Sequence, residues 1–261
     1  MKALATAATG MHAQQMAVDV ISNNIANANT TAFKSSRMAF RDLVYQSVQR
    51  EGAATSQAGT STPTGIDIGL GVEGAGTARL LTQGGLSGTG DDLDVAIDGG
   101  GYFVVAAPDG GQTYTRDGAF RLSAEGEIVT MAGHSIDPGI VVPERTKAIE
   151  IGEDGEVLAY VENDPDPVAI GRLTLATFVN EGGLRPIGTN LFEATSASGD
   201  PIQGAPGDPG FGSVRQGYLE NSNVDVIQQI TDLIKAQRAY ELNSKTIETA
   251  DQMMSTATRT R

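Results

Sequence analysis

The sequence contains no cysteine and no tryptophan, and only two of its 261 residues are histidine. Without cysteine the chain forms no disulfide and offers no thiolate to a metal ion. His12 and His134 are far apart in the sequence, and no Asp/Glu cluster with ligand-like spacing accompanies either of them. We therefore expect neither a metal site nor a cofactor.

Catalytic signatures are scarce as well. No G-x-S-x-G elbow occurs, and no serine has a histidine base nearby in the sequence. The segment GLGVEG, with Gly69, Gly71 and Gly74, matches the dinucleotide fingerprint, but no buried strand precedes it and no sufficiently long helix follows. We interpret these glycines as turn residues and expect no enzyme. The sequence does not exclude a catalytic pair of carboxylates like that of a glycosidase. Aromatic residues, at 5% of the chain, are however few for a cleft that stacks sugars.

Long apolar runs are also absent, because Gln and Asp interrupt the N-terminal stretch MHAQQMAVDVISNN. We expect no cleaved secretory signal, so that the protein is either cytosolic or exported by a route that needs none.

The formal net charge of −14 is unevenly distributed. Residues 1–50 carry five Lys/Arg against two Asp, which gives +3, and residues 217–261 carry five Lys/Arg against six Asp/Glu, which gives −1. Residues 51–216 therefore carry −16. An acidic surface keeps a protein soluble and disfavours nucleic acid as a partner. The nearly neutral ends are typical of surfaces that become buried.

Apolar residues recur at seven-residue spacing near both ends of the chain. The N-terminal series is Leu4, Met11, Val18 and Ile25, and the C-terminal series is Val226, Leu233, Tyr240, Ile247 and Met254, supported by Ile230, Ala236 and Ala250. Narrow seams on helices of about 37 Å and about 50 Å predict a coiled coil made by the two termini. Two ordinary amphipathic helices on a globular core fit the same periodicity. A membrane-surface helix is disfavoured because neither segment has a strongly basic face.

Between these ends the amino-acid composition and hydrophobic pattern of the sequence change twice. Residues 46–90 are rich in Gly, Ser, Thr and Ala, which predicts an extended connector. From Leu93 to about Ala194, short alternating runs are separated by glycine turns, and Asp109-Gly110, Asp117-Gly118 and Asp154-Gly155 indicate hairpins. We predict an α+β fold with a helical domain from residues 1–35 and 220–261, a connector over residues 36–90, and a mainly antiparallel β domain over residues 91–219.

The exit of the first helix, ISNNIANANTTAFKSSR, holds four asparagines within seven residues: Asn23, Asn24, Asn27 and Asn29. Asparagine competes for backbone hydrogen bonds and favours caps and turns. We expect these side chains to end the helix tightly.

The segments described above resemble one known family, the axial proteins of the bacterial flagellum, which are rod and hook subunits. SNNIANANTTAFKSSRMAF resembles the family's N-terminal signature, and QGYLENSNVDVIQQITDLIKAQRAYELNSKTIETADQMM resembles its C-terminal signature. DVAIDGGGYFVV and YTRDGAFRLSAEGEIVT are similar to the β domain that rod and hook proteins share. The total length and the insertion around residues 46–66 are most similar to those of the distal-rod members.

The resemblance implies a structural, non-enzymatic subunit that polymerises into a rigid tubular drive shaft between motor and hook. Heterologous contacts repeated around a helix produce such an open filament. The helical domain would lie inside and the β domain outside. The asparagine-rich exit would turn the chain out of the crowded inner tube, helped by the tolerance of asparagine for left-handed backbone. The seven-residue series and Ile230 would mediate self-assembly.

The resemblance further implies export through the flagellar type III apparatus and a location in the basal body, across the periplasm. The expected partners are further copies of the chain, proximal rod and hook proteins, and the surrounding rings, without membrane insertion. Two alternatives are a hook or proximal-rod subunit and, from another class, a secreted carbohydrate-active enzyme.

Overall fold

The computed structural model describes residues 2–49, 64–107, 110–162 and 166–259. The chain divides into two compact units. Unit 1 comprises residues 1–26, 36–80 and 225–261, and unit 2 comprises residues 27–35 and 81–224. The chain therefore passes between the units four times, after residues 26, 35, 80 and 224.

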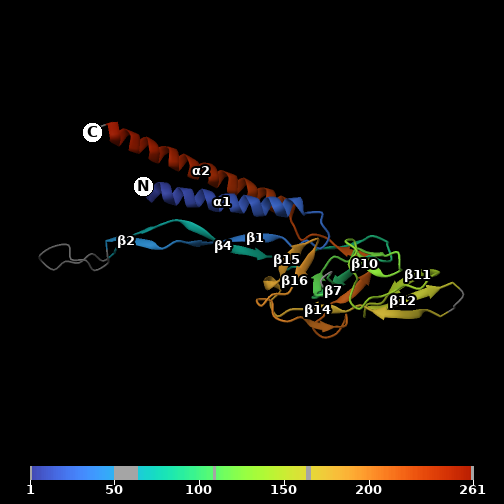
Figure 1. Ribbon diagram of the computed structural model, residues 1–261. Coiled ribbons are helices and arrows are strands. Elements are labelled where there is room, and N and C mark those ends of the chain that lie inside the picture. The colour runs from blue at the N-terminus through green and yellow to red at the C-terminus, as the bar shows by residue number, and fades with distance from the viewer. Residues whose placement is uncertain (1, 50–63, 108–109, 163–165, 260–261) are drawn as a thin grey trace. The chain divides into compact units, whose positions relative to one another are not determined.

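Unit 1 combines two long helices with short strands (Figure 1). Its elements are α1 (Lys2–Ala26), β1 (Ser36–Asp42), β2 (Tyr45–Gln49), β3 (Ile66–Gly69), β4 (Val72–Arg79) and α2 (Val226–Arg259). Ala, Gln and Met, which have high helix propensity, fill much of α1. Asp225 caps α2, because its Oδ1 accepts the backbone N–H groups of Ile227 and Gln228 at 3.0 and 3.2 Å. The two predicted helices are thereby confirmed.

The strands of unit 1 form two antiparallel pairs, β1 with β4 and β2 with β3. The β1–β4 ladder shifts register between Ala39 and Phe40, opposite Gly76, whose φ is +151°. These strands fall within residues 36–90, and the predicted division into helical domain, connector and β domain stays a prediction. Residues 50–63, which make up most of the insertion around residues 46–66, lie outside the described residues.

Unit 2 is built from short antiparallel strands. They are β5 (Leu86–Gly88), β6 (Val95–Asp98), β7 (Tyr102–Ala106), β8 (Gln112–Thr115), β9 (Phe120–Leu122), β10 (Ile128–Thr130), β11 (Thr146–Ile151), β12 (Glu156–Val161), β13 (Val168–Arg172), β14 (Leu175–Thr177), β15 (Arg185–Gly188), β16 (Leu191–Glu193), β17 (Ile202–Gly204), β18 (Ser213–Gln216) and β19 (Tyr218–Glu220), with a 3₁₀ turn, η1 (Glu181–Gly183). Within the described residues, the largest sheet has the order β15-β16-β8-β7-β14-β17. The predicted α+β class is therefore confirmed.

The core of unit 2 covers both faces of this sheet. Side chains alternate across a strand, and in β7 Phe103 joins one buried cluster while Tyr102 and Val104 join another. Edge-to-face contacts between aromatic rings fix both clusters: Phe103 with Phe120 at 5.1 Å between ring centroids, and Tyr114 with Phe178 at 4.8 Å. Although the chain has few aromatic residues, those that pack on this sheet are enough to fill the centre of both clusters.

The predicted Asp154-Gly155 hairpin is found, and the strands on either side of Asp109-Gly110 also pair, although Asp109 itself lies outside the described residues. Gly110 and Gly155, with φ of +82° and +78°, lie in the connections β7–β8 and β11–β12, and both strand pairs are antiparallel neighbours. The prediction for Asp117-Gly118 is wrong, because β8 pairs with β7 and β16 whereas β9 pairs with β10. Gly118 instead allows a close backbone approach, since a Cβ there would lie 1.6 Å from the carbonyl oxygen of Val95.

Candidate functional site

The two helices of unit 1 pack against each other and run antiparallel (Figure 1). Gly10 lies against Asn243, and a Cβ at Gly10 would come within 2.9 Å of the Asn243 Nδ2. Nearer the other end, Asn24 Nδ2 donates to Gln229 Oε1 at 3.0 Å. The separation is 14 residues on each helix, from 10 to 24 and from 243 back to 229. The pair therefore keeps one register over two seven-residue repeats.

Small side chains alternate with amide side chains at the positions at which this register brings the helices together. Continuing the register by seven residues places half-buried Ala17 opposite Ala236, which is buried, whereas Ala3, opposite the buried Ala250, is exposed. Small residues at the contact let two helix axes approach closely. On α1 these positions precede the predicted apolar series by one residue. The signal was present in the sequence as Gly and Ala at seven-residue spacing, but the larger apolar residues beside it obscured it.

The predicted self-assembly residues border this contact. The half-buried members are Leu4, Met11, Val18, Ile25, Leu233 and Ile247. The remaining members are between 40% and 46% exposed: Val226, Ile230, Tyr240 and Met254. All of them therefore keep some accessible surface in a single chain, and their role in assembly stays a prediction.

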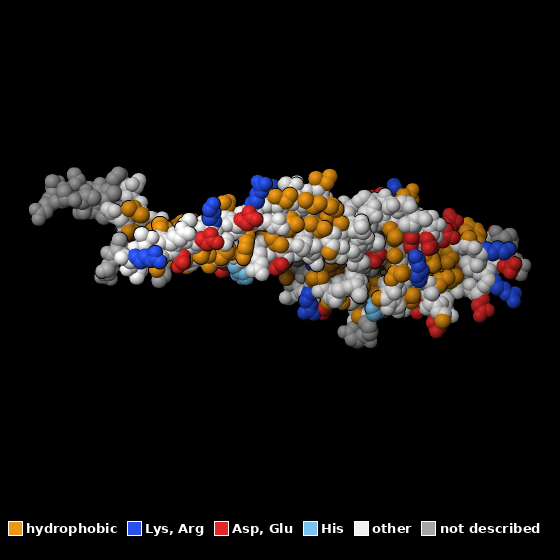
Figure 2. Space-filling model, turned by 90° about the horizontal axis from the view of Figure 1, so that it is seen from above, with side chains coloured by type: hydrophobic (Ala, Val, Ile, Leu, Met, Phe, Trp, Pro, Cys, Tyr) orange, Lys and Arg blue, Asp and Glu red, His pale blue; other side chains and the backbone are white. Residues whose placement is uncertain are grey.

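One face of α2 exposes further apolar surface. Ile227, Ile230 and Ile234 follow one another at spacings of four residues or fewer, which places them on one side of the helix. Ile227 is 79% exposed, and Ile230 and Ile234 are each 46% exposed. Hydrophobic side chains at the surface are visible in Figure 2. Neighbouring exposed apolar residues are typical of interaction surfaces.

A buried asparagine holds the end of α1 within unit 1. Asn24 is 1% exposed, its Nδ2 donates to the carbonyl of Ser36 at 2.8 Å, and its Oδ1 accepts the N–H of Ser36 at 2.9 Å. In unit 2, Asn27 Oδ1 accepts the Thr30 hydroxyl at 3.1 Å. Asn27 thus supports the turn that follows α1, whereas Asn24 lies within α1 and attaches the helix to β1, so the expectation that all these asparagines end the helix is wrong for Asn24. The left-handed residue of this exit is Ala32, with φ of +56°, and not an asparagine.

The segment GLGVEG serves the packing of unit 1. Gly71, with φ of +121°, lies in the turn between β3 and β4, and a Cβ there would fall 2.1 Å from Thr9 Oγ1. Gly74 lies inside β4, where a Cβ would meet the Cε atom of Met38 at 2.4 Å. Interpreting these glycines as turn residues is therefore correct for Gly71. It is wrong for Gly69, the last residue of β3, and for Gly74, which gives space to a methionine.

Unit 2 contains a buried ion triad centred on Glu220, at the end of β19. Lys34 Nζ lies 2.5 Å from Glu220 Oε1, and Arg116 Nε lies 2.7 Å from Glu220 Oε2. The side chains of Lys34, Arg116 and Glu220 are 3%, 6% and 1% exposed. The backbone N–H of Gly84 also donates to Oε1, at 2.9 Å. The carboxylate therefore binds three segments that are far apart in the sequence.

The two cations of the triad use their remaining donors on backbone carbonyls. Lys34 Nζ donates to Thr82 at 2.9 Å, and the terminal nitrogens of Arg116 donate to Gly101 and Gly99 at 2.9 and 2.7 Å. Among the described residues, no buried side-chain nitrogen or oxygen lacks a hydrogen-bond partner. A buried charge is tolerated under these conditions, when it is both paired and hydrogen-bonded.

The triad shifts the pKa values of its members. Burial would raise the pKa of the Glu220 carboxyl, but Arg116, Lys34 and the N–H of Gly84 together lower it below its ordinary value of 4.5. Burial lowers the pKa of Lys34, and its bond to Glu220 compensates only in part. Glu220 is therefore ionised at neutral pH.

Sequence reasoning did not single out Lys34, Arg116 or Glu220. The sequence hints at two of these residues only through their position in uncharged stretches. Lys34 is the only charged residue between 20 and 36, and Glu220 is the only one between 216 and 224. An isolated charge in an uncharged stretch does not reveal its partner, which here lies 186 residues away.

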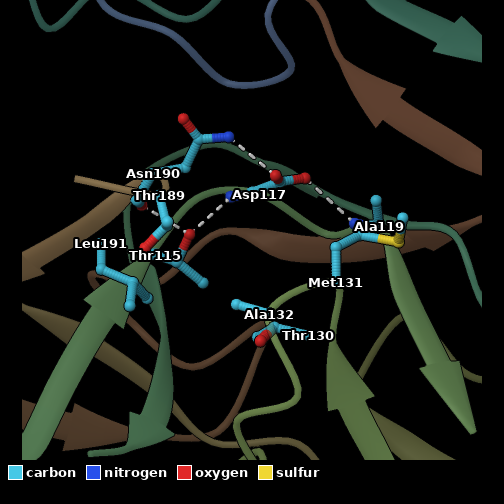
Figure 3. Close-up of a pocket in the computed structure, with 9 residues that line it drawn as sticks. All are labelled: Thr115, Asp117, Ala119, Thr130, Met131, Ala132, Thr189, Asn190 and Leu191. Atoms are coloured by element: carbon cyan, nitrogen blue, oxygen red, sulfur yellow. Dashed lines mark hydrogen bonds between the residues drawn. The ribbon is translucent and has the colours of Figure 1, made fainter.

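One pocket of unit 2, of about 360 Å³, is lined by Thr115, Asp117, Ala119, Thr130, Met131, Ala132, Thr189, Asn190 and Leu191 (Figure 3). Its polar groups bind one another. Asn190 Nδ2 donates to Asp117 Oδ2 at 2.8 Å, and the Thr115 hydroxyl donates to the carbonyl of Asn190 at 2.8 Å. Asp117 Oδ1 accepts the N–H of Ala119 at 3.1 Å. These bonds stabilise the surrounding loops, so the pocket does not present a set of polar groups directed at a ligand.

The described residues contain neither a metal cluster nor a helix suited to a membrane. No group of three or more His, Cys, Asp or Glu side chains there is arranged to hold a metal ion. Neither helix, over its described length, is both long enough and apolar enough to span a bilayer.

Three family models match the chain. The model described as flagella basal body rod protein matches residues 4–34, and the flagellar hook protein FlgE/F/G D1 domain matches residues 96–159. The model described as flagellar basal body rod FlgEFG protein C-terminal matches residues 215–260. The matches include both terminal segments and the first half of the β region.

Full-length relatives agree with these matches. The chain is 50% identical over 255 residues to the flagellar basal-body rod protein FlgG of Agrobacterium fabrum, which covers 98% of this chain and 97% of that protein. It is 48% identical over 261 residues to FlgG of Caulobacter vibrioides, with 100% of both chains covered. Against the rod protein FlgF of the same organism the identity is 34% over 245 residues, covering 92% of this chain and 89% of FlgF.

Proposed function

We propose a function for this chain from the premise that it belongs to the FlgG family of flagellar basal-body rod proteins. The family is structural and non-enzymatic, and the chain is a rod subunit of the flagellar basal body. Membership also implies self-polymerisation within the flagellar axial structure. We propose in addition where the subunit lies in the rod and through which surface it assembles.

The proposed position is the distal rod, where the polymer acts as a drive shaft between motor and hook. Identity to FlgG exceeds identity to the rod protein FlgF within one organism, 48% against 34%, which favours the position of FlgG over that of FlgF. Proximal rod and hook proteins at its two ends, the surrounding rings, and delivery by type III export belong to the same proposal.

The proposed assembly surface is the helical pair of unit 1, acting as a coiled-coil-like inner domain. The observation that carries this proposal is the apolar face of α2, where Ile227, Ile230 and Ile234 are 46% to 79% exposed in a single chain. Covering such side chains stabilises an assembly by roughly 25 cal/mol for each Å² of apolar surface removed from water. Further copies of the chain are the proposed occupants of this face.

The distribution of charge supports the choice of unit 1. Unit 1 has ten Lys/Arg and ten Asp/Glu, which gives zero, whereas unit 2 has eight Lys/Arg and 22 Asp/Glu, which gives −14. Units that all carry a charge of −14 repel one another. The neutral unit is therefore the better candidate for close contacts between copies.

The test places a charge on this face in a strain that lacks its own rod subunit. The full-length chain should restore rods, and the double variant Ile230→Asp/Ile234→Asp should not. Val179→Asp is the control, because Val179 of unit 2 is 86% exposed and lies outside the proposed surface. Rods formed at normal yield by the double variant would contradict the proposal.

A further inference from the structure

All four passages between the units adjoin three short segments of unit 2: residues 27–35, 81–84 and 220–224. Two backbone hydrogen bonds join the first segment to the third. The N–H of Ala32 donates to the carbonyl of Glu220 at 2.8 Å, and the N–H of Asn223 donates to the carbonyl of Phe33 at 3.2 Å. The segments that enter and leave unit 2 are thus bound to each other.

Side-chain hydrogen bonds connect the second segment, residues 81–84, to the other two. Asn223 Oδ1 accepts the N–H of Ser35 at 2.7 Å, and Asn223 Nδ2 donates to the carbonyl of Thr82 at 3.0 Å. Lys34 bridges the same carbonyl of Thr82 and the carboxylate of Glu220, which in turn accepts the N–H of Gly84. Each of the three segments is therefore linked to the other two.

Arg116 attaches these segments to the β core. It lies just after β8, pairs with Glu220, and donates to the carbonyls of Gly99 and Gly101, which lie between β6 and β7. Residues of both strands, Ile97 and Phe103, belong to the main buried cluster. Glu220 is thus the shared partner of the connecting segments and the core.

We propose that Lys34, Arg116 and Glu220 act as a clamp that holds the connecting segments rigidly on unit 2, so that a twisting load on the chain reaches the β core without local unfolding. Glu220 is the central positioning residue. The inference rests on the proposed role as a drive shaft, because resistance to twisting matters only in a subunit that transmits rotation.

The chemistry of the triad suits this role. Removing one partner from a buried ion pair leaves an uncompensated charge. A conformation in which only one of the two ion pairs is broken is therefore high in free energy. An exposed ion pair would open readily, because water screens the separated charges. An apolar contact of the same size holds segments together without fixing their direction, whereas the hydrogen bonds of this triad are directional.

The first test measures amide hydrogen exchange in the full-length chain before assembly. Lys34→Met removes the ammonium and keeps most of the side-chain volume. It should raise exchange at the N–H groups of Ala32, Gly84 and Asn223 by roughly 100-fold and leave β7 and β14 protected as before. Arg172→Met is the matched control, since Arg172 pairs with Asp154 on the surface of the same unit and should change neither set.

Asn223→Ala is a milder second variant that removes the ties to Ser35 and Thr82 and leaves the triad charges in place. It should raise exchange at the same connecting segments by a smaller factor. Unchanged exchange in both variants would overturn the clamp. An equal rise at the connecting segments and in β7 and β14 in both variants would also overturn it, because the triad would then serve only general stability.

The second test separates the clamp from the proposed function. In a strain without its own rod subunit, the Lys34→Met chain should form rods and support swimming in dilute medium, and swimming should fail at high viscosity. Wild-type swimming under load would overturn the clamp and leave the rod assignment intact. Failure of the unaltered chain to form rods would instead contradict the proposed function.

Discussion

Replacing Tyr240 with alanine tests the assembly surface quantitatively. Tyr240 is the largest residue of the predicted C-terminal series, and it is 43% exposed in a single chain. Truncating a fully buried aromatic side chain costs about 3–5 kcal/mol. Because only a little over half of Tyr240 is covered by its own chain, the cost to the isolated subunit should be about 2 kcal/mol.

The remaining cost should appear only in the polymer. If neighbouring copies cover the exposed part of Tyr240, each subunit loses about a further 2 kcal/mol on assembly. Since 1.4 kcal/mol corresponds to a factor of ten, the critical concentration for polymerisation should rise roughly 30-fold. The β unit should stay folded, because Tyr240 belongs to unit 1.

Sedimentation of the polymer over a concentration series measures the critical concentration, and thermal unfolding of the unpolymerised chain monitors the two units. Val179→Ala is the control, because Val179 is 86% exposed and lies in unit 2. A critical concentration that is unchanged in Tyr240→Ala would refute the reasoning and place this side chain on an outer surface of the polymer.

Three further predictions concern unit 2. Gly118→Ala should destabilise it by at least about 3 kcal/mol in denaturant titrations, because the added Cβ would lie 1.6 Å from the Val95 carbonyl oxygen, whereas Gly100→Ala, which meets nothing within 4 Å, should be tolerated. Acid should destabilise unit 2 through Glu220. Arg116, Lys34 and Gly84 lower the pKa of the Glu220 carboxyl below 4.5 in the folded chain, against the effect of burial. The contribution of Glu220 to folding stability is therefore complete above about pH 4.5 and is lost as the pH falls further. Glu220→Gln should flatten this acid limb in thermal unfolding measured between about pH 6 and pH 3, and an identical limb would refute the assignment. Raising the salt concentration should lower the critical concentration for polymerisation. At 0.1 M salt the Debye length is about 10 Å, so the −14 charges of neighbouring copies of unit 2 are only partly screened, and added salt weakens their repulsion. Light scattering that shows weaker assembly at higher salt would contradict this.

The sequence allowed the helices and the β class to be predicted because their signals are local. A seven-residue period and a run of short alternating segments do not depend on the rest of the chain. The contacting face of α1 is different, because it depends on which partner lies opposite. Gly10 belongs to a seven-residue series of small residues that the larger apolar residues beside it obscure, yet it lies directly against Asn243.

Long-range topology also explains what the sequence did not reveal. Asp-Gly favours the same turn whether the next strand folds back or crosses to another sheet, so Asp117-Gly118 does not reveal that β8 and β9 pair with different strands. Glu220 meets Lys34 and Arg116 across 186 and 104 residues, and only the folded strands bring them together. The asparagine-rich exit could be predicted as a helix end, but the attachment of Asn24 to Ser36 and Gln229 depends on the packing of unit 1.

A helical reconstruction by electron cryomicroscopy of the polymer formed by this chain tests the central claim most directly, namely that the chain is a rod subunit assembled through its helical pair. The account predicts that α1 and α2 remain antiparallel with Gly10 against Asn243, and that neighbouring copies cover Ile227, Ile230 and Ile234. A polymer in which this face of α2 stays open to solvent while copies meet through unit 2 would contradict it.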